Sequence, residues 1–276
     1  MFTPRQLLIQ AGLRPKKRYA QNFLQNASAA RKIARLSLAN APAQTRTLEI
    51  GAGTGALTLA LLEEGADLTA IEIDADLVNV LRSRQDLARA SILHGDALTF
   101  DYRAWAAGHH WNVAGNLPYN VATAVLLSLI EMEDGPFALT AMVQIDVAQR
   151  LVAAPGTAAY GSLSVAVQYA METQQVFTLS PGSFFPSPKV RSAVVRLERR
   201  DEPLVRPRDA AIFWKVVRGA FAYRRKTLAN SLALALDLDR ATIGRALRAS
   251  NLSPELRGER LDLADFARLA DALAER

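Results

Sequence analysis

Short apolar runs alternate with helical patterns over the first two thirds of the chain. Several of these runs end in glycine or in a polar residue, as expected where a buried strand leaves its sheet. The expected strands are residues 45–50, 68–73, 91–93, 111–114 and 138–144, and the expected helices are 56–64, one ending at Arg84, and 122–130. Such alternation predicts a mostly parallel α/β sheet covered by helices on both faces. Ligands of these sheets bind outside the carboxyl ends of the strands.

The pattern changes near residue 200. Two more strands, at 173–179 and 191–198, close the predicted sheet, and the charged segment 201–209 contains Pro203 and Pro207, as a linker would. Helical periodicity without strands follows, at 210–221, 226–235, 240–248 and 263–274. We therefore predict an α/β domain over residues 1–203 and a small all-helical domain over 204–276.

Composition narrows the class of protein. The 276 residues can bury a full core, and half of them are apolar. No apolar run approaches the roughly 18 residues of a membrane span, and the start lacks a hydrophobic signal core. The absence of cysteine excludes disulfides, thiolate nucleophiles and cysteine-ligated zinc. We expect a cytoplasmic protein, a monomer, without membrane contact and without a metal.

The net charge of +6 is unevenly distributed. Residues 1–48 contain nine Lys or Arg and no acid, and residues 186–230 contain twelve Lys or Arg against four acids. If the two segments converged on one face, they would form a surface that binds phosphates, as in nucleic-acid binders. Two separate solvated faces are the alternative.

Four successive strand ends carry polar groups or glycines suited to a nucleoside. Gly51, Gly53 and Gly55 follow the first strand, and their spacing lacks both the dinucleotide fingerprint and the Lys-Ser/Thr of a phosphate loop. Glu72 comes 21 positions after Gly51, near the offset at which an acid binds ribose hydroxyls, although it could also be a helix N-terminal charge. Asp96 follows the third strand and could accept from an adenine amine. This order is typical of methyltransferases that use S-adenosylmethionine.

The fourth strand ends in Asn116-Leu117-Pro118-Tyr119, which suits an amino group on a flat ring. The amide oxygen of Asn116 and the carbonyl of Leu117 can accept the hydrogens of adenine N6. Pro118 fixes φ and has no N–H to compete, and Tyr119 offers a ring for stacking. An ordinary Asn-capped turn before a helix is the alternative for so short a motif.

At this point the chain resembles a known family, the ribosomal RNA adenine N6-dimethyltransferases, and within it the bacterial small-subunit branch. The resemblance covers nearly the whole chain. The matching stretches are residues 17–24, 48–58, 72–74, 95–98, 116–120, 147–151, 160–164, 184–190, 224–232 and 256–261.

The resemblance implies a role for each matching position. The residues that would bind S-adenosylmethionine are Asn22, Leu24, Gly51, Gly53, Glu72, Ile73, Asp96, Ala97 and Asn116. The catalytic set would be Asn116, Leu117, Pro118, Tyr119 and Phe184, with the target adenine between the rings of Tyr119 and Phe184; the alternative for Phe184 is a core aromatic. The RNA contacts would be Lys17, Arg18, Lys189, Arg224, Arg225 and Lys226, each with a solvated charge as its alternative.

The activity implied by the resemblance is transfer of methyl groups from S-adenosylmethionine to N6 of two adjacent adenines in a hairpin near the 3′ end of 16S ribosomal RNA. S-adenosylhomocysteine would be the product, and the immature small ribosomal subunit the partner. The chain departs from the family at Ala20, where Gly is usual, at Asn26, where Asp is frequent, at Ala52, where Pro is common, and at residues 144–146. None of these departures removes a group with a chemical role.

Three other functions remain open. A large-subunit resistance methyltransferase shares the Asn-x-Pro-Tyr motif, but segments 184–190 and 224–232 favour the small-subunit branch. DNA adenine methyltransferases favour Asp/Asn-Pro-Pro-Tyr instead. A non-catalytic assembly factor is disfavoured by the intact Gly51, Glu72, Asp96 and Asn116.

Overall fold

The computed structural model describes residues 2–223 and 225–275, and these form two compact units. The first, the sheet unit, runs to Ala148 and includes Thr173–Arg199. The second, the helical unit, combines Gln149–Glu172 with the chain from Arg200 onward. The predicted division at residues 203 and 204 had assigned Gln149–Glu172 to the sheet domain, so the helical unit contains a segment that this division did not include.

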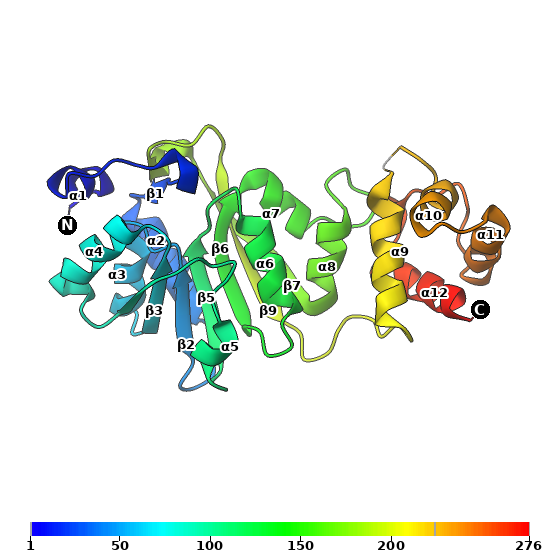
Figure 1. Cartoon of the computed structure of the whole chain (residues 1–276), viewed down its shortest axis with the longest axis horizontal. Coiled ribbons are helices and arrows are strands. Elements are labelled where there is room, and N and C mark those ends of the chain that lie inside the picture. The colour runs from blue at the N-terminus through cyan, green and yellow to red at the C-terminus, as the bar shows by residue number, and fades with distance from the viewer. Residues whose placement is uncertain (1, 224, 276) are drawn as a thin grey trace. The chain divides into compact units, whose positions relative to one another are not determined.

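The sheet unit contains seven strands in one sheet (Figure 1). They are β2 Arg46–Ile50, β3 Asp67–Glu72, β4 Ser91–His94, β5 Trp111–Asn116, β6 Ala138–Gln144, β7 Met171–Leu179 and β9 Ser192–Arg199. Their order is β4-β3-β2-β5-β6-β9-β7; the first five are parallel, and β9 is antiparallel to β6. The predicted mostly parallel sheet is confirmed. Ile50 pairs with Ile71 on one side and with Gly115 on the other, so β2, β3 and β5 end at the same edge.

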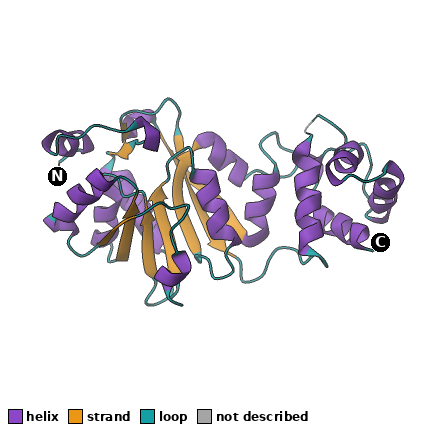
Figure 2. Cartoon of the chain, viewed as in Figure 1, coloured by secondary structure: helices purple, strands orange, loops and turns teal. Residues whose placement is uncertain are grey.

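Helices cover both faces of this sheet (Figure 2). Those of the sheet unit are α1 Pro4–Gln10, α2 Ala27–Leu38, α3 Ala56–Glu63, α4 Ala75–Ser83, α5 Tyr102–Ala106 and α6 Ala122–Glu131, and α7 Ile145–Leu151 crosses into the other unit. The connection from β2 to β3 and that from β5 to β6 run in opposite directions along the sheet. Because such crossovers are right-handed, α3 and α6 lie on opposite faces, and a crevice opens where β2 meets β5.

Helix α2 was not among the predicted elements, although its sequence is amphipathic. Ala30, Ile33 and Ala34 follow helical spacing and are at most 1 % exposed, and the Asn26 side chain caps the first turn by accepting from the Ala29 N–H. Its last carbonyls are bonded by side chains of the sheet: Arg196 donates to Leu36 and Ala39, and Asn112 donates to Ser37. These bonds satisfy the acceptors that a helix end leaves free, and they attach α2 to β5 and β9.

A second, two-stranded sheet joins distant segments. Strand β1, Phe23–Leu24, pairs antiparallel with β8, Phe184–Phe185. The Gln25 N–H extends the contact by donating to the Ser183 carbonyl at 2.9 Å. The N-terminal arm, which is the chain before α2, is thereby attached to the segment that precedes β9.

The helical unit has its own core. It contains α8 Ser162–Ala170, α9 Ala210–Ala222, α10 Leu228–Leu236, α11 Arg240–Ala249 and α12 Leu263–Ala274, and the last four match the predicted helices within two residues. Tyr160, Phe213 and Phe266 are at most 1 % exposed and belong to one cluster. In the described part of the chain, none of the helices has the length and apolarity required to cross a bilayer.

Candidate cofactor and adenine site

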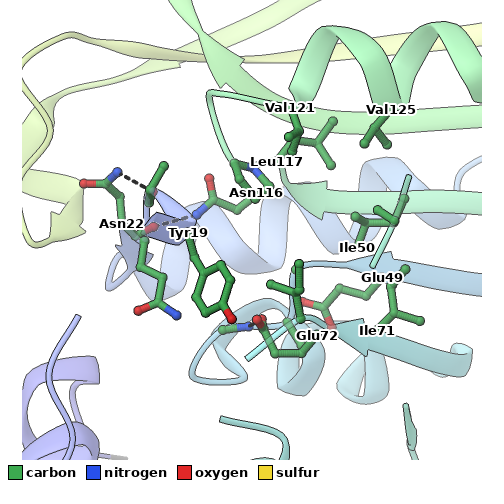
Figure 3. Close-up of a pocket in the computed structure, with 18 of the residues that line it drawn as sticks. Tyr19, Asn22, Glu49, Ile50, Ile71, Glu72, Asn116, Leu117, Val121 and Val125 are labelled. Atoms are coloured by element: carbon green, nitrogen blue, oxygen red, sulfur yellow. Dashed lines mark hydrogen bonds between the residues drawn. The ribbon is translucent and has the colours of Figure 1, made fainter. Parts of the chain in front are cut away.

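One cavity of about 280 Å³ lies at the carboxyl ends of the parallel strands in the sheet unit (Figure 3). The structure brings most of the predicted site residues to its wall. Those lining it are Arg18, Asn22, Leu24, Gly51, Gly53, Glu72, Ile73, Asp96, Ala97, Asn116, Leu117, Pro118 and Tyr119. The cavity occupies the crevice that the strand order predicts for a ligand.

The glycine turn after β2 allows close approach on two sides. Gly51 and Gly53 have φ of 76° and 58°, in the left-handed region that side chains rarely adopt. A Cβ at position 53 would lie 3.0 Å from the Phe23 ring of the arm, and one at position 51 would lie 3.6 Å from the Asn116 carbonyl oxygen. The turn therefore lets both the arm and the end of β5 close on the cavity.

Glu72 is buried at the end of β3 and held by the backbone. Its Oε2 accepts from the Gly53 N–H at 2.8 Å, and its Oε1 accepts from the Asp74 N–H at 3.0 Å. Burial raises the pKa of Glu72, and these backbone hydrogen bonds oppose the rise. A carboxylate offers about four acceptor positions, so lone pairs remain for a pair of hydroxyls.

The loop after β4 positions Asp96. The Asp96 Oδ1 accepts from the Leu98 N–H at 2.9 Å, which leaves the second carboxyl oxygen for another donor. Tyr102, at the start of α5, donates its hydroxyl to the Ala97 carbonyl at 2.5 Å. The loop is thus held by the internal hydrogen bond to Asp96 and by the hydrogen bond from Tyr102 of α5.

Asn116 has a defined amide orientation. Its Nδ2 donates to the Asn22 carbonyl at 2.7 Å, and Asn22 in turn donates from its own amide to the Ala20 carbonyl at 3.0 Å. Because a carbonyl oxygen only accepts, the NH₂ group of Asn116 must face Asn22, which leaves Oδ1 as an acceptor. Figure 3 shows this amide between the arm and Leu117.

Leu117 and Tyr119 complete the motif after β5. The Leu117 N–H donates to the Met142 carbonyl at 3.1 Å, and no described residue donates to the Leu117 carbonyl. The Tyr119 hydroxyl lies 2.7 Å from the Ser192 hydroxyl, which fixes the ring at the cavity wall. Burial raises the pKa of Tyr119, opposed by the bond to Ser192, so the phenol is neutral near pH 7.

Phe184 is not brought to the cavity in this structure. Its ring is 2 % exposed and belongs to the core cluster of the sheet unit, whereas Phe185 packs partly buried against Phe23. Successive strand residues point to opposite faces, and β8 turns Phe184 inward. Phe184 therefore occupies a core position, which was the alternative for this residue. Its stacking on the target adenine stays a prediction.

The predicted RNA contacts are exposed wherever the structure describes them. Lys17, Arg18 and Lys189 belong to the sheet unit, and the Arg18 guanidinium lies 4.6 Å from the centre of the Tyr19 ring. Arg225 and Lys226 belong to the helical unit, in the turn before α10 rather than in a helix. Arg224 lies outside the described residues.

Tyr19 and Glu49 are among the cavity residues that the sequence reasoning missed. Tyr19, on the short helical turn Lys17–Tyr19, extends its ring towards Glu72 (Figure 3). Glu49, inside β2, is 1 % exposed, and its Oε2 has no hydrogen-bond partner among the described residues. Burial raises the pKa of Glu49 to about 8. A charged residue inside an apolar strand was a visible signal for Glu49, whereas nothing in the sequence distinguishes Tyr19.

These groups fit an adenine nucleoside that carries a positive charge. The glycines make room for backbone contact, Glu72 can accept from a diol, and Asp96 can accept from an amine. Glu49 lies beside Glu72, and a bound cation would favour the ionised forms of both carboxyls, whose pKa burial raises.

Comparison with known proteins finds a matching family and similar proteins. The model of the family described as "Ribosomal RNA adenine dimethylase" matches residues 12–268. A protein of Pseudomonas aeruginosa named "Ribosomal RNA small subunit methyltransferase A" is 43 % identical over 95 % of this chain and 96 % of its own length. One of the same name from Lactococcus lactis is 38 % identical over 94 % of this chain and 90 % of its own.

Solved structures share the fold. A dimethyladenosine transferase from Plasmodium falciparum aligns with a TM-score of 0.75 at 22 % identity, covering 90 % of this chain and 95 % of its own. The 23S rRNA methyltransferase ErmE aligns with a TM-score of 0.69 at 24 % identity, covering 92 % of this chain and all of its own. The predicted Rossmann-like methyltransferase fold is confirmed. On the family model and the identity to its relatives, the chain belongs to the ribosomal RNA adenine dimethylase family.

Proposed function

We propose that the protein transfers methyl groups from S-adenosylmethionine to N6 of two adjacent adenines in a hairpin near the 3′ end of 16S ribosomal RNA. The relatives from P. aeruginosa and L. lactis, named as small-subunit methyltransferases, favour this substrate. The observation that carries the chemistry is the orientation of Asn116, whose NH₂ is bound by the Asn22 carbonyl so that its oxygen is left to accept.

The residues at three strand ends would hold the cofactor. Glu72 would bind the ribose hydroxyls, Asp96 the adenine amine, and the turn at Gly51 the methionine part. S-adenosylmethionine would supply a methyl group on a sulfonium centre and become S-adenosylhomocysteine. The positive charge of the bound cofactor would favour the ionised forms of Glu49 and Glu72, which would in turn attract that charge.

The end of β5 would hold the target amine. Asn116 Oδ1 and the Leu117 carbonyl would accept its two hydrogens, which draws the nitrogen lone pair out of conjugation with the ring and towards the methyl group. Tyr119 would stack on the flipped base, held in place by Ser192. These groups position and polarise the amine, and no described side chain is needed as a strong base because the proton can leave to solvent after transfer.

Dimethylation places a further demand on the same groups. After the first transfer the amine retains one hydrogen, so one of the two acceptors is sufficient to hold it. Asn116 and Leu117 lie side by side at the end of β5, which lets the monomethyl base bind in either orientation of its remaining hydrogen.

The partner in this proposal is the immature small ribosomal subunit, in the cytoplasm, with the protein acting as a monomer. The exposed Lys17, Arg18 and Lys189 of the sheet unit and Arg225 and Lys226 of the helical unit would contact phosphates.

The test replaces Asn116 by Ala. Methyl transfer to immature small subunits should fall by about 100-fold or more, as when one positioned polar group is lost from a transition-state site. Binding of S-adenosylmethionine, measured by calorimetry, should persist within several fold. Asn79→Ala, on the exposed face of α4, is the matched control and should keep full activity.

The same assay separates the other functions. Activity of Asn116→Ala near that of the unchanged protein would contradict the assignment. Methylation of isolated 23S RNA, but not of small-subunit particles, would indicate the large-subunit reaction. Failure of the unchanged protein to bind S-adenosylmethionine would leave only a non-catalytic assembly factor.

A further inference from the structure

In the N-terminal arm, the loop from Lys16 to Gln21 is bound to the start of α4 by the carboxylate of Asp74. Lys16 Nζ donates to Asp74 Oδ1 at 2.5 Å, and Gln21 Nε2 donates to Asp74 Oδ2 at 2.9 Å. The Gln21 side chain also accepts from the Lys16 N–H at 2.7 Å. The two ends of the loop Lys16 to Gln21 therefore meet at Asp74.

Asp74 is held in its ionised form. It is 3 % exposed and also caps α4 by accepting from the Asp76 N–H at 3.2 Å. Burial alone would raise the pKa of Asp74, but the hydrogen bonds from Lys16 and Gln21 outweigh it and keep the pKa below its ordinary value. The bond from Lys16 to Asp74 and a second bond from Lys16 to Asp76 raise the pKa of Lys16. The attachment is thus a charge-assisted one between a fixed anion and the arm.

The loop closed in this way lines the cavity. Arg18 and Tyr19 lie between the two attachment points, and Asn22 follows directly after them. Asn22 provides the carbonyl that orients the Asn116 amide. On the other side, the Asp74 N–H donates to Glu72. Asp74 therefore links the carboxylate at the end of β3 to the arm that sets the amide at the end of β5.

We propose that Lys16, Gln21 and Asp74 act as positioning residues that hold the arm closed over the cofactor. The proposal rests on the proposed function, because it assumes that the cavity binds S-adenosylmethionine. With the bonds to Asp74 made, Tyr19 covers the cavity next to Glu72, and Asn22 keeps Asn116 in its accepting orientation. In this proposal the arm lifts, and these bonds break, when the cofactor product leaves.

Exchange of the cofactor is the step on which this attachment acts. Contacts that exist only when the arm is closed slow dissociation more than association. Loss of a charge-assisted bond should therefore increase the dissociation rate of S-adenosylhomocysteine. It should also lower kcat through the freed Asn116 amide.

The test is Lys16→Met, which keeps the length and apolar stem of the side chain. Dissociation of S-adenosylhomocysteine, measured by surface plasmon resonance, should become about tenfold faster, the scale of one charge-assisted hydrogen bond. Arg35→Met on α2 is the matched control. It removes the same charge away from the loop Lys16 to Gln21, breaks the ion pair with Glu64 at the end of α3, and should leave the rate unchanged. The difference should shrink in high salt, because Lys16 is 27 % exposed.

Gln21→Ala and Asp74→Asn provide independent variants. Gln21→Ala removes one attachment without a change of charge, and Asn at position 74 remains a good helix cap. Both should speed dissociation while the thermal midpoint of the ligand-free protein stays close to that of the unchanged protein. A purely structural role would instead lower that midpoint and leave the dissociation rate unaltered.

The outcomes separate this proposal from the proposed function. If the unchanged protein binds the product and Lys16→Met releases it no faster, or only as Arg35→Met does, the positioning role is wrong. If the unchanged protein binds the product but methylates no ribosomal RNA, the proposed function fails, whereas faster release from the variants still supports the positioning role.

Discussion

At the scale of single residues, Glu49 is the most unusual group in the cavity. It is a carboxyl in the middle of a buried strand, next to a second buried carboxyl at Glu72. Desolvation raises its pKa to about 8, the charge of Glu72 adds to the rise, and the neighbouring Thr58 opposes it. At neutral pH in the absence of ligand, most Glu49 side chains are protonated.

This shift predicts a dependence of stability on pH. The unfolded chain loses the Glu49 proton near the ordinary value of 4.5, whereas the folded protein keeps it up to about 8. Between these values the folded state binds more protons, so stability falls as the pH rises, by about 1 kcal/mol per pH unit. Glu49→Gln should therefore flatten the pH dependence of the urea midpoint between pH 5 and 8. The exposed Glu131→Gln should not, and equal slopes in both variants would contradict the assignment.

The place of some site residues could be predicted from the sequence, whereas that of others could not. The order of Gly51, Glu72, Asp96 and Asn116 along the chain was sufficient to predict that they lie close together. Parallel strands end at one edge and bring their last residues to one cavity. Phe184 shows the limit. Which of two adjacent aromatics turns inward depends on the pairing of β8 with β1, and the partners are about 160 residues apart.

At the scale of elements, the loop after β4 depends on α5 for its position. Tyr102 is 7 % exposed, its ring stacks on Trp111 and meets Phe100 edge-on, and its hydroxyl holds the Ala97 carbonyl. Burial, with the nearby charge of Asp96 second, raises the pKa of Tyr102, so the hydroxyl keeps its proton as a donor.

Tyr102→Phe should therefore loosen the loop that would bind the cofactor adenine. The aromatic packing remains, but the bond to Ala97 is lost, at a cost of about 1 kcal/mol. We expect the affinity for S-adenosylmethionine to fall by several fold in calorimetry, with kcat at saturating cofactor unchanged. Tyr160→Phe, in the helical unit, is the matched buried control. An unchanged affinity in Tyr102→Phe would mean that the loop holds its shape without this bond.

The strands of the large sheet and the helices after residue 209 were predictable because their apolar periodicity is strong, and the bounds agree within a few residues. Helix α2 was missed because its exposed face carries Arg31, Lys32 and Arg35, which made the segment read as a basic lead-in. The structure also gives a physical reason why the family usually has glycine where this chain has Ala20. Ala20 has a φ of 49°, at the end of the turn in the arm, where glycine would adopt the same conformation without strain.

At the scale of the whole molecule, the two units are interleaved along the chain. The segment Gln149–Glu172 contributes Ala153, Tyr160 and Val165 to the core of the helical unit, together with Phe213 and Phe266. The sequence could not show this, because the apolar residues of that segment are compatible with burial against either unit. Only the contacts made by residues far along the chain decide between them.

A truncation tests whether the segment Gln149–Glu172 needs the rest of the helical unit to bury its apolar side chains. A chain of residues 1–203, which ends at the predicted domain boundary, would keep α8 but lose the helices that bury Tyr160 and Val165. We expect it to bind a hydrophobic dye and to aggregate. A chain that ends at Arg199 and replaces residues 149–172 by a Gly-Ser linker removes the same apolar surface and should stay soluble. A soluble 1–203 chain with a cooperative unfolding transition and no dye binding would contradict this division.

The interleaving also sets the order in which a newly made chain can fold. Synthesis delivers α8 before β9, so the sheet unit can complete its strands as soon as Arg199 has left the ribosome. The apolar side of α8 must wait longer, until α12 at the end of the chain has been made. Because domains fold as they emerge, the cavity should form on the nascent chain while α8 is still without its partners. During that interval we expect the segment around Tyr160 to expose the apolar side chains that the helical unit later buries.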